Sequence, residues 1–232
     1  PSWGPKKLRA VLVERRPEVT WPAPSSIGEL LRREGLSVAR RRRAALPAVR
    51  PFAPVEAPND LWCIDFKGWF RTRDGARCDP LTITDADSRY LLECRILPPT
   101  LAAVQPAVDQ VFRDFGLPRA MRSDNGAPFA SIGAGGLSRL AVHWVKLGIR
   151  LERIEPGQPQ QNGRHERMHA TLKAETARPP ADSAAEQQAR FDAFRRDFTD
   201  NRPHHALAQI PPIRPYHASP RPSPADIRQT PY

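Results

Sequence analysis

The chain has 232 residues, a net charge of +11 and 40% hydrophobic residues. This length allows one large domain or a core with a small appendage. No apolar run approaches the roughly 18 residues that a membrane helix needs, and the charged N-terminus lacks the apolar segment of a signal peptide. We therefore expect a soluble, cytoplasmic globular protein. Because the first residue is Pro1, we also expect a truncated or processed start.

The cysteines of this chain predict neither disulfide bonds nor a zinc site. They are odd in number, far apart in sequence and do not form a zinc motif. We expect reduced, partly buried thiols. They are Cys63, Cys78 and Cys94.

Positive charge is concentrated near the N-terminus. Residues 1–50 hold twelve lysines and arginines against four glutamates, which is eight of the eleven net charges. This asymmetry predicts a polyanionic partner at this end of the chain. A solvated basic tail that only maintains solubility is the alternative.

Two short helices are predicted in this basic region. An apolar stripe predicts the first over 5–16, and a serine cap with helical spacing up to Gly35 predicts the second. The second helix resembles the recognition half of a helix-turn-helix, and it would present Arg32 and Arg33 to DNA. A helical hairpin that serves only as a scaffold is the alternative.

The next residues are basic and then rich in proline. A run of four arginines cannot be absorbed by a core, and we expect it to bind DNA phosphates. Its members are Arg40, Arg41, Arg42 and Arg43. The prolines that follow keep the chain extended. We therefore predict a partial helix-turn-helix DNA-binding segment over 1–43 and a proline-rich linker over 44–58.

A compact domain is predicted over 59–200, and a proline-rich C-terminal extension over 201–232 that wraps the surface or extends. In chain order the predicted elements are strands over 61–70, 77–84 and 90–97, a helix over 101–115, a strand over 120–122, a helix over 137–147, a strand over 150–154, and helices over 162–176 and 183–200. This order predicts an α/β fold in which helices flank a mixed five-stranded sheet.

Three acidic residues occupy positions that suit a metal site. Asp65 follows an apolar run, Asp124 follows a short strand, and Glu166 lies at the start of a helix. A protein this basic gains little from carboxylates that converge in its interior, but such a group can hold Mg²⁺ against a nucleic-acid phosphate. The alternatives are an ion pair of Asp65 with Lys67 or an arginine, a simple turn at Asp124, and a solvent-facing charge at Glu166.

The segments around these acids form an ordered set. They are Trp62-Cys63-Ile64-Asp65-Phe66-Lys67-Gly68, Thr84-Asp85-Ala86-Asp87-Ser88-Arg89-Tyr90, Phe115-Gly116-Leu117-Pro118, Arg122-Ser123-Asp124-Asn125-Gly126, Pro159-Gln160-Gln161-Asn162-Gly163-Arg164-His165-Glu166-Arg167 and Asn201-Arg202-Pro203-His204-His205-Ala206-Leu207. Together they resemble the catalytic core of bacterial insertion-sequence transposases of the retroviral-integrase type, the DDE polynucleotidyl transferases. The resemblance spans roughly residues 59–216.

The resemblance implies a ribonuclease-H-like fold and catalysis with two Mg²⁺ ions, for which Mn²⁺ can substitute. Asp65 would bridge both metals, and Asp124 and Glu166 would each complete one. One spacing departs from the family: 41 residues separate Asp124 from Glu166, where about 35 are common. The surplus fits a surface insertion at 131–136. The upstream Glu152 and Glu155 both lack the flanking motif of Glu166, and neither is the expected ligand.

The helix after Glu166 predicts contacts to DNA. His169 and Lys173 share its face, and Lys173 would reach phosphates of the DNA end. An exposed lysine without such a role is the alternative. His165 is expected to support the site rather than to bind metal. The other predicted DNA contacts in this domain are Arg164, Arg167 and Asn125.

These features predict a transposase or integrase that cleaves DNA and transfers strands of a mobile element. Metal-activated water would attack the phosphate at the element end, and the freed 3′-hydroxyl would then attack target DNA. The alternatives are a catalytically silent DNA-binding regulator and a nuclease that only hydrolyses. Expected partners are double-stranded DNA, as element ends and target, and further copies of the chain in a homo-multimer on DNA. The expected location is the bacterial nucleoid.

Overall fold

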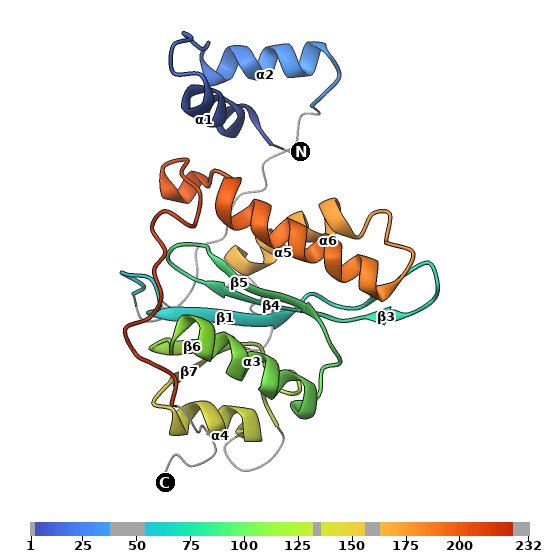
Figure 1. Cartoon of the computed structure of the whole chain (residues 1–232), viewed down its shortest axis with the longest axis vertical. Coiled ribbons are helices and arrows are strands. Elements are labelled where there is room, and N and C mark those ends of the chain that lie inside the picture. Colours follow the sequence, from blue (N-terminus) through green and yellow to red (C-terminus); the bar gives the residue numbers. More distant parts are fainter. Residues whose placement is uncertain (1–2, 38–53, 132–135, 156–162, 225–232) are drawn as a thin grey trace.

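The computed structural model describes residues 3–37, 54–131, 136–155 and 163–224. Its elements follow the predicted order (Figure 1). The helices are α1 (Pro5–Arg15), α2 (Pro24–Arg33), α3 (Leu101–Phe115), α4 (Arg139–Lys146), α5 (Gly163–Thr176) and α6 (Ala184–Arg196), with a π-helical turn η3 (Asp197–Asn201) and a 3-10 turn η4 (His205–Leu207). The strands are β1 (Leu61–Phe66), β2 (Phe70–Arg71), β3 (Arg77–Cys78), β4 (Pro80–Asp85), β5 (Leu91–Ile96), β6 (Ala120–Ser123) and β7 (Arg150–Arg153).

The central sheet has five strands and is mixed, which confirms the predicted α/β class. Its order is β5-β4-β1-β6-β7. Strand β4 is antiparallel to β1 and to β5, whereas β6 is parallel to β1 and to β7. Strand β1 therefore lies in the middle of the sheet. Because β1 and β6 are parallel, their carboxyl ends meet at one edge, where ligand sites of α/β proteins commonly form.

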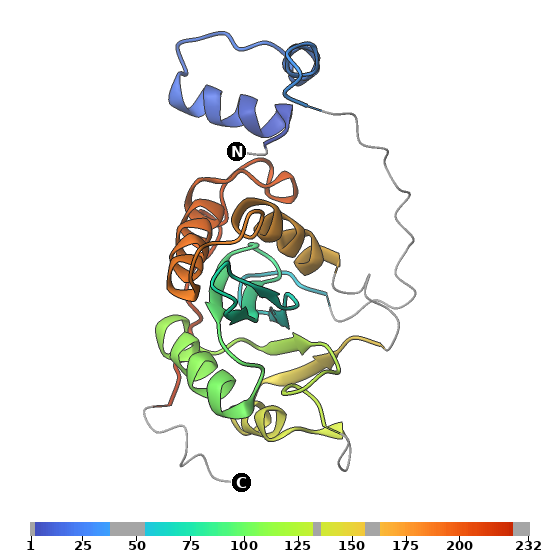
Figure 2. The same ribbon diagram turned by 90° about the vertical axis from the view of Figure 1, so that its right-hand side faces the viewer.

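One face of the sheet packs against α3 and α4 (Figure 2). Alternate residues of the central strands point to this face, and Trp62, Ile64, Leu81 and Ile83 are fully buried there. The Trp62 ring lies 6.0 Å from the ring of Phe112 on α3. Each such side chain contributes about 1.5–3 kcal/mol to folding. This apolar layer fixes the position of β1 in the domain.

The opposite face carries α5 and α6 and holds both apolar and polar side chains. Its apolar cluster joins β5 to both helices and comprises Leu91, Cys94, Met168, Leu172, Phe191, Phe194 and Phe198. Polar residues of the central strands lie beside this cluster: Asp65 pairs with Thr82 in the β1–β4 ladder, and Thr82 contacts α5. The second face is therefore where polar chemistry is possible.

A separate two-stranded ribbon interrupts the predicted first and second strands. Strands β2 and β3 pair only with each other, and the predicted turn at Arg73-Asp74-Gly75 joins them. The interruption follows Gly68, whose φ of +83° is a left-handed conformation that turns the chain out of the sheet. In Figure 1 this ribbon projects from the side of the domain.

The described part of the C-terminal extension wraps the domain rather than projecting from it. Tyr216 stacks on Tyr90 with ring centroids 4.2 Å apart. Arg221 donates hydrogen bonds to the Pro118 carbonyl at 2.6 Å and the Gly148 carbonyl at 3.0 Å. The extension thereby links the loop before β6 to the loop before β7. Residues 225–232 lie outside the described part.

The N-terminal helices match the predicted hairpin. Helix α1 contacts α2, and Glu14 at its end pairs with Arg214 of the C-terminal extension. Within the described ranges, no helix has the length and apolar character that crossing a membrane would require. The three cysteines are free thiols and all are buried, as predicted.

Candidate active site

Two of the predicted acids lie at the carboxyl ends of neighbouring parallel strands. Asp65 belongs to β1, and its side chain is 20% exposed. Asp124 directly follows β6. The ladder pairs Cys63 with Arg122, so the same register continued by two residues sets Asp65 beside Asp124. The Gly126 N–H donates to Asp124 Oδ1 at 3.0 Å, which shapes the turn after the strand.

Glu166 approaches the same region from the first turn of α5, and its side chain is exposed. Burial, and to a smaller extent the negative charges of Asp124 and Glu166, raise the pKa of Asp65 to about 7, against a lowering by the Phe66 backbone N–H and by Lys67. Three carboxylates therefore act on one another electrostatically. Such a group binds a cation favourably, because a positive charge relieves their repulsion.

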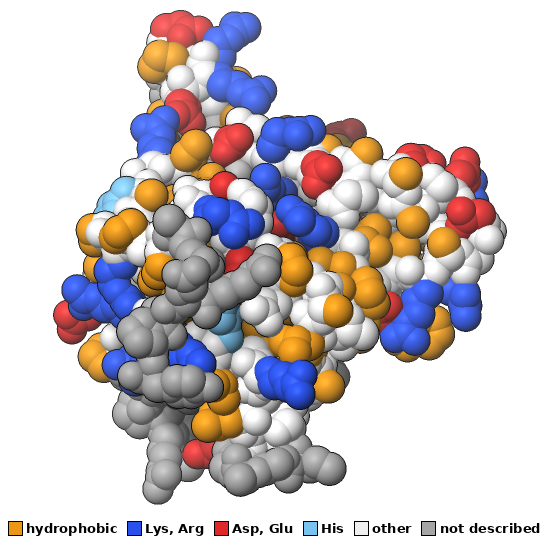
Figure 3. Space-filling model, turned by 60° about the horizontal axis from the view of Figure 1, so that its bottom comes forward, with side chains coloured by type: hydrophobic (Ala, Val, Ile, Leu, Met, Phe, Trp, Pro, Cys, Tyr) orange, Lys and Arg blue, Asp and Glu red, His pale blue; other side chains and the backbone are white. Residues whose placement is uncertain are grey.

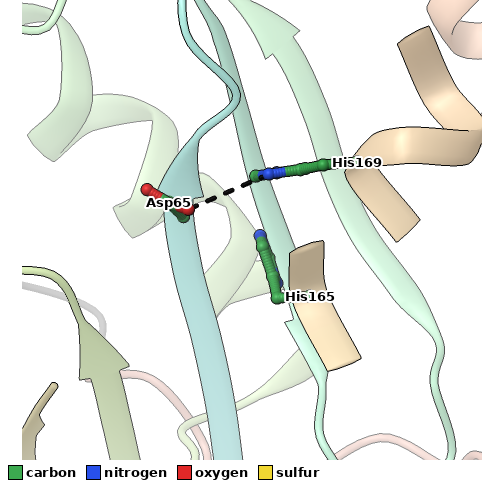
Figure 4. A group of neighbouring side chains, drawn as sticks. All are labelled: Asp65, His165 and His169. Atoms are coloured by element: carbon green, nitrogen blue, oxygen red, sulfur yellow. Dashed lines mark ion pairs between the residues drawn. The ribbon is translucent and has the colours of Figure 1, made fainter. Parts of the chain in front are cut away.

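Two histidines of α5 lie behind Asp65 (Figure 4). His165 and His169 are buried, and their rings lie 4.4 Å apart in an edge-to-face arrangement. Thr82 Oγ1 lies 2.7 Å from His165 Nε2 and 2.6 Å from His169 Nε2. Thr84 Oγ1 lies 2.8 Å from His165 Nδ1. The dashed line in Figure 4 joins His169 Nδ1 to Asp65 Oδ2, which are 3.8 Å apart.

The hydrogen bonds constrain where the protons lie. The Thr82 hydroxyl has one proton and donates it to the Asp65 carbonyl at 3.2 Å. With the hydroxyl in this orientation, both histidines donate from Nε2 to Thr82 Oγ1, and His165 Nδ1 accepts from Thr84. Burial lowers the pKa of His165 to about 3 and that of His169 to about 2, so both rings are neutral at pH 7. His169 therefore presents a lone pair, not a proton, towards Asp65.

The structure offers two groups of possible metal ligands around Asp65. Ligand atoms of Asp65, His165 and His169 lie within 4.8 Å of one another. Both ring nitrogens of His165 already have hydroxyl partners. Mg²⁺ prefers oxygen ligands. The carboxylates of Asp65, Asp124 and Glu166 thus fit Mg²⁺ better, and the histidine pair, through its hydrogen bonds to Thr82 and Thr84, fits the role of a support that fixes α5 on the sheet beside Asp65.

The shared hydroxyl of Thr82 gives a stability prediction. Thr82→Val keeps the shape and the strand preference of the residue but leaves two buried imidazole nitrogens without their partner, so we expect it to lower the free energy of unfolding by about 2–4 kcal/mol. Thr84→Val removes the partner of one nitrogen and should cost about half as much. Urea unfolding followed by circular dichroism measures both. Equal costs for the two variants would contradict the bridging role of Thr82.

The residues predicted to contact DNA differ in their exposure to solvent. Lys173 and Arg167 are exposed on α5. The Asn125 amide donates to the Ile154 carbonyl at 2.6 Å and holds the loop together. His169 is buried, which favours a supporting role over a contact to DNA.

On α2, Arg32 and Arg33 are exposed and pair with Glu29 and Glu34, respectively. The described residues do not include the side chain of Arg164 or the arginines at 40–43. They also leave out 132–135, which make up most of the expected surface insertion. The DNA contacts stay predictions.

Sequence reasoning missed Thr82 and Thr84. Their signal was present, because polar residues recur at alternate positions of an otherwise apolar strand, on the face that also carries Asp65. Glu152 forms an ion pair with Arg122 on the neighbouring strand at 2.7 Å.

Comparisons with known proteins agree with this architecture. The integrase core domain family matches residues 55–159, and a second integrase core domain description matches 147–212. An insertion element IS407 protein of 31.7 kDa from Burkholderia multivorans is 30% identical over 216 residues, which is 90% of this chain and 74% of that protein. An insertion element IS476 protein of 39.2 kDa from Xanthomonas euvesicatoria is 29% identical, over 91% of this chain and 60% of that protein.

Solved structures share the fold. The catalytic core of HTLV-2 integrase, in a complex with magnesium, superposes with a TM-score of 0.54 at 14% identity and covers 69% of this chain and 98% of its own. A chain of the simian T-cell lymphotropic virus intasome reaches a TM-score of 0.59 at 16% identity, over 96% of this chain and 78% of its own. A ribonuclease-H-like α/β core with carboxylates at adjacent strand ends is thus the class of structure present. The chain belongs to the integrase core domain family, and within it to the transposases of bacterial insertion elements.

Proposed function

We propose that this transposase cleaves DNA at the ends of its element and joins the freed strands to target DNA, with Asp65, Asp124 and Glu166 as metal ligands. The observation that carries the proposal is that the strand register sets Asp65 beside Asp124, and that the negative charges of Asp124 and Glu166 both act on Asp65. A basic protein has no structural need for such a cluster, whereas phosphoryl transfer requires one.

Each carboxylate has a distinct position in this proposal. Asp65 lies on the central strand, and the charges of both other acids act on it, which suits it to bridge two ions. Asp124, after β6, and Glu166, on α5, would each complete one. When bound, two Mg²⁺ ions, or Mn²⁺ in their place, would activate the attacking oxygen and stabilise charge on the phosphate and the leaving oxygen.

Other residues near the carboxylates would position the DNA. Lys67, two residues after Asp65, and the exposed Lys173 on α5 offer positive charge beside the carboxylates for backbone phosphates. His165 and His169 keep α5 on the sheet beside Asp65 through their hydrogen bonds to Thr82 and Thr84. The chain forms no covalent intermediate in this scheme, so positioning and electrostatics supply the rate.

The proposed partners are double-stranded DNA and further copies of the chain. Two element ends must be processed together, which a multimer on DNA achieves. The basic α2 face and the arginine run at 40–43 would bind the DNA outside the catalytic domain.

A joining assay tests the proposal. Full-length protein is incubated with Mg²⁺ or Mn²⁺, labelled duplexes that carry the terminal sequence of the element, and supercoiled target plasmid. We expect nicked ends and covalently joined products, and neither product with EDTA. Cleavage without joined products would favour a nuclease, and DNA binding without cleavage would favour a silent regulator.

A further inference from the structure

A tryptophan is displayed on the ribbon next to the carboxylates. Trp69 directly precedes β2 and is 57% exposed, which is unusual for this residue type. It follows Gly68, whose left-handed φ of +83° turns the chain away from the sheet. The chain thus passes from Asp65 through Lys67 to Trp69 within four residues. An exposed aromatic this close to the proposed site invites a functional explanation.

Two arginines flank the ring on the same side of the ribbon. Arg71 and Arg77 face each other across the β2–β3 ladder. Their guanidinium carbons lie 5.9 Å and 5.1 Å from the Trp69 ring centroid. Arg77 also forms a bidentate pair with Asp79 at 2.7 and 2.8 Å, whereas Arg71 donates to the neutral Gly75 carbonyl at 2.6 Å. Positive charge and an aromatic surface therefore occur together.

A small hollow connects this platform to α5. It measures about 130 Å³ and is lined by Lys67, Trp69 and Lys173 among other residues. Ligand pockets commonly measure about 300–1,000 Å³, so this hollow can hold a part of a nucleotide, such as its phosphate, but does not enclose a whole small molecule. Lys67 also lowers the pKa of Asp65, which places the hollow beside the carboxylates. Figure 3 shows basic side chains next to hydrophobic ones on the lobe at the right, where the ribbon projects in Figure 1.

We propose that this platform binds the terminal nucleotide of a DNA end: its base stacks on Trp69, and its phosphate lies between Lys67 and Lys173. The inference rests on the proposed function and names how that site recognises its substrate. Bases inside a duplex have both faces covered by neighbours, whereas a terminal or unpaired base has a free face that can stack on an aromatic side chain. The platform therefore distinguishes a DNA end from continuous duplex.

Fluorescence of 2-aminopurine tests the stacking directly. The fluorophore is placed either at the terminal position of the element-end duplex or in its middle, and the protein carries Asp65→Asn so that the DNA stays intact. We expect quenching of the terminal fluorophore and none of the internal one. Trp69→Ala should abolish the terminal quenching and weaken binding of the free-ended duplex about tenfold. Trp69→Phe should retain part of both.

A matched control uses Arg113→Ala, which removes an exposed arginine on α3, the helix across the sheet. Quenching and affinity should stay unchanged in that variant, and circular dichroism should show that Trp69→Ala is folded. If Trp69→Ala still quenches the terminal fluorophore, the inference is wrong while the proposed function stands. Failure of the Asp65→Asn parent to bind the duplex, together with no joined products from wild type, would overturn both.

Discussion

Asp65→Asn, Asp124→Asn and Glu166→Gln should each lower strand transfer at least about 10³-fold while leaving DNA binding within about twofold. Each substitution keeps the size of the side chain and removes one negative charge, and with it one proposed metal ligand. The bound cations would then lose a ligand at the point where charge develops in the reaction. Gel assays of joined products and fluorescence anisotropy of labelled duplexes measure the two quantities separately.

The loss should be similar for all three because the carboxylates act as one unit. Double variants should therefore be little worse than single ones, since the effects of groups that act together are not additive. The matched control is Glu155→Gln, which removes an exposed acid just after β7, and we expect near wild-type transfer. Substantial transfer by any of the three variants would remove that residue from the site. The result for Glu166 matters most, because its spacing from Asp124 departs from the common pattern.

Asp65→Asn should also make the metal-free protein more stable, by about 4 kcal/mol at pH 8. The pKa of Asp65 is raised from 3.8 to about 7, mainly by burial and then by Asp124. A folded-state pKa above the unfolded value means that the folded protein binds this proton more tightly. The contribution of the group to stability is therefore complete below about pH 4 and is lost as the pH rises through 7. Asparagine carries no charge and avoids this loss.

The pH dependence separates this explanation from a simple packing effect. The difference in free energy of unfolding between Asp65→Asn and wild type should be near zero at pH 4 and should grow up to about pH 8. Urea unfolding in EDTA measures it. Saturating Mn²⁺ should stabilise wild type and have little effect on the variant, because only wild type retains the carboxylate that we propose to bridge the ions. A difference that does not vary with pH would show that the charge of Asp65 is not penalised in the folded state. Like charges that converge at a functional site are expected to lower the stability of the folded wild-type protein.

Much of the fold could be predicted because its signals are local. The helix at 101–115 begins and ends as its apolar spacing and Gly116 predict. The strands were predicted in the right order, but the first two were too long. The strand signal at Phe70 and Arg77 is real, yet these residues pair in a ribbon of their own. Alternation reports that a segment is extended, and it does not report which partner that segment has.

The sequence by itself determined the class of protein, the order of the elements and the positions of the three acids, since motif and periodicity are properties of neighbouring residues. Only the tertiary structure decided what surrounds Asp65. The Thr82 hydroxyl contacts histidines that are 83 and 87 residues away, through a β1–β4 register and a helix that crosses the sheet. Trp69 likewise becomes a displayed platform only because the chain leaves the sheet at Gly68. Such long-range contacts depend on how separate elements pack, and no local pattern encodes them.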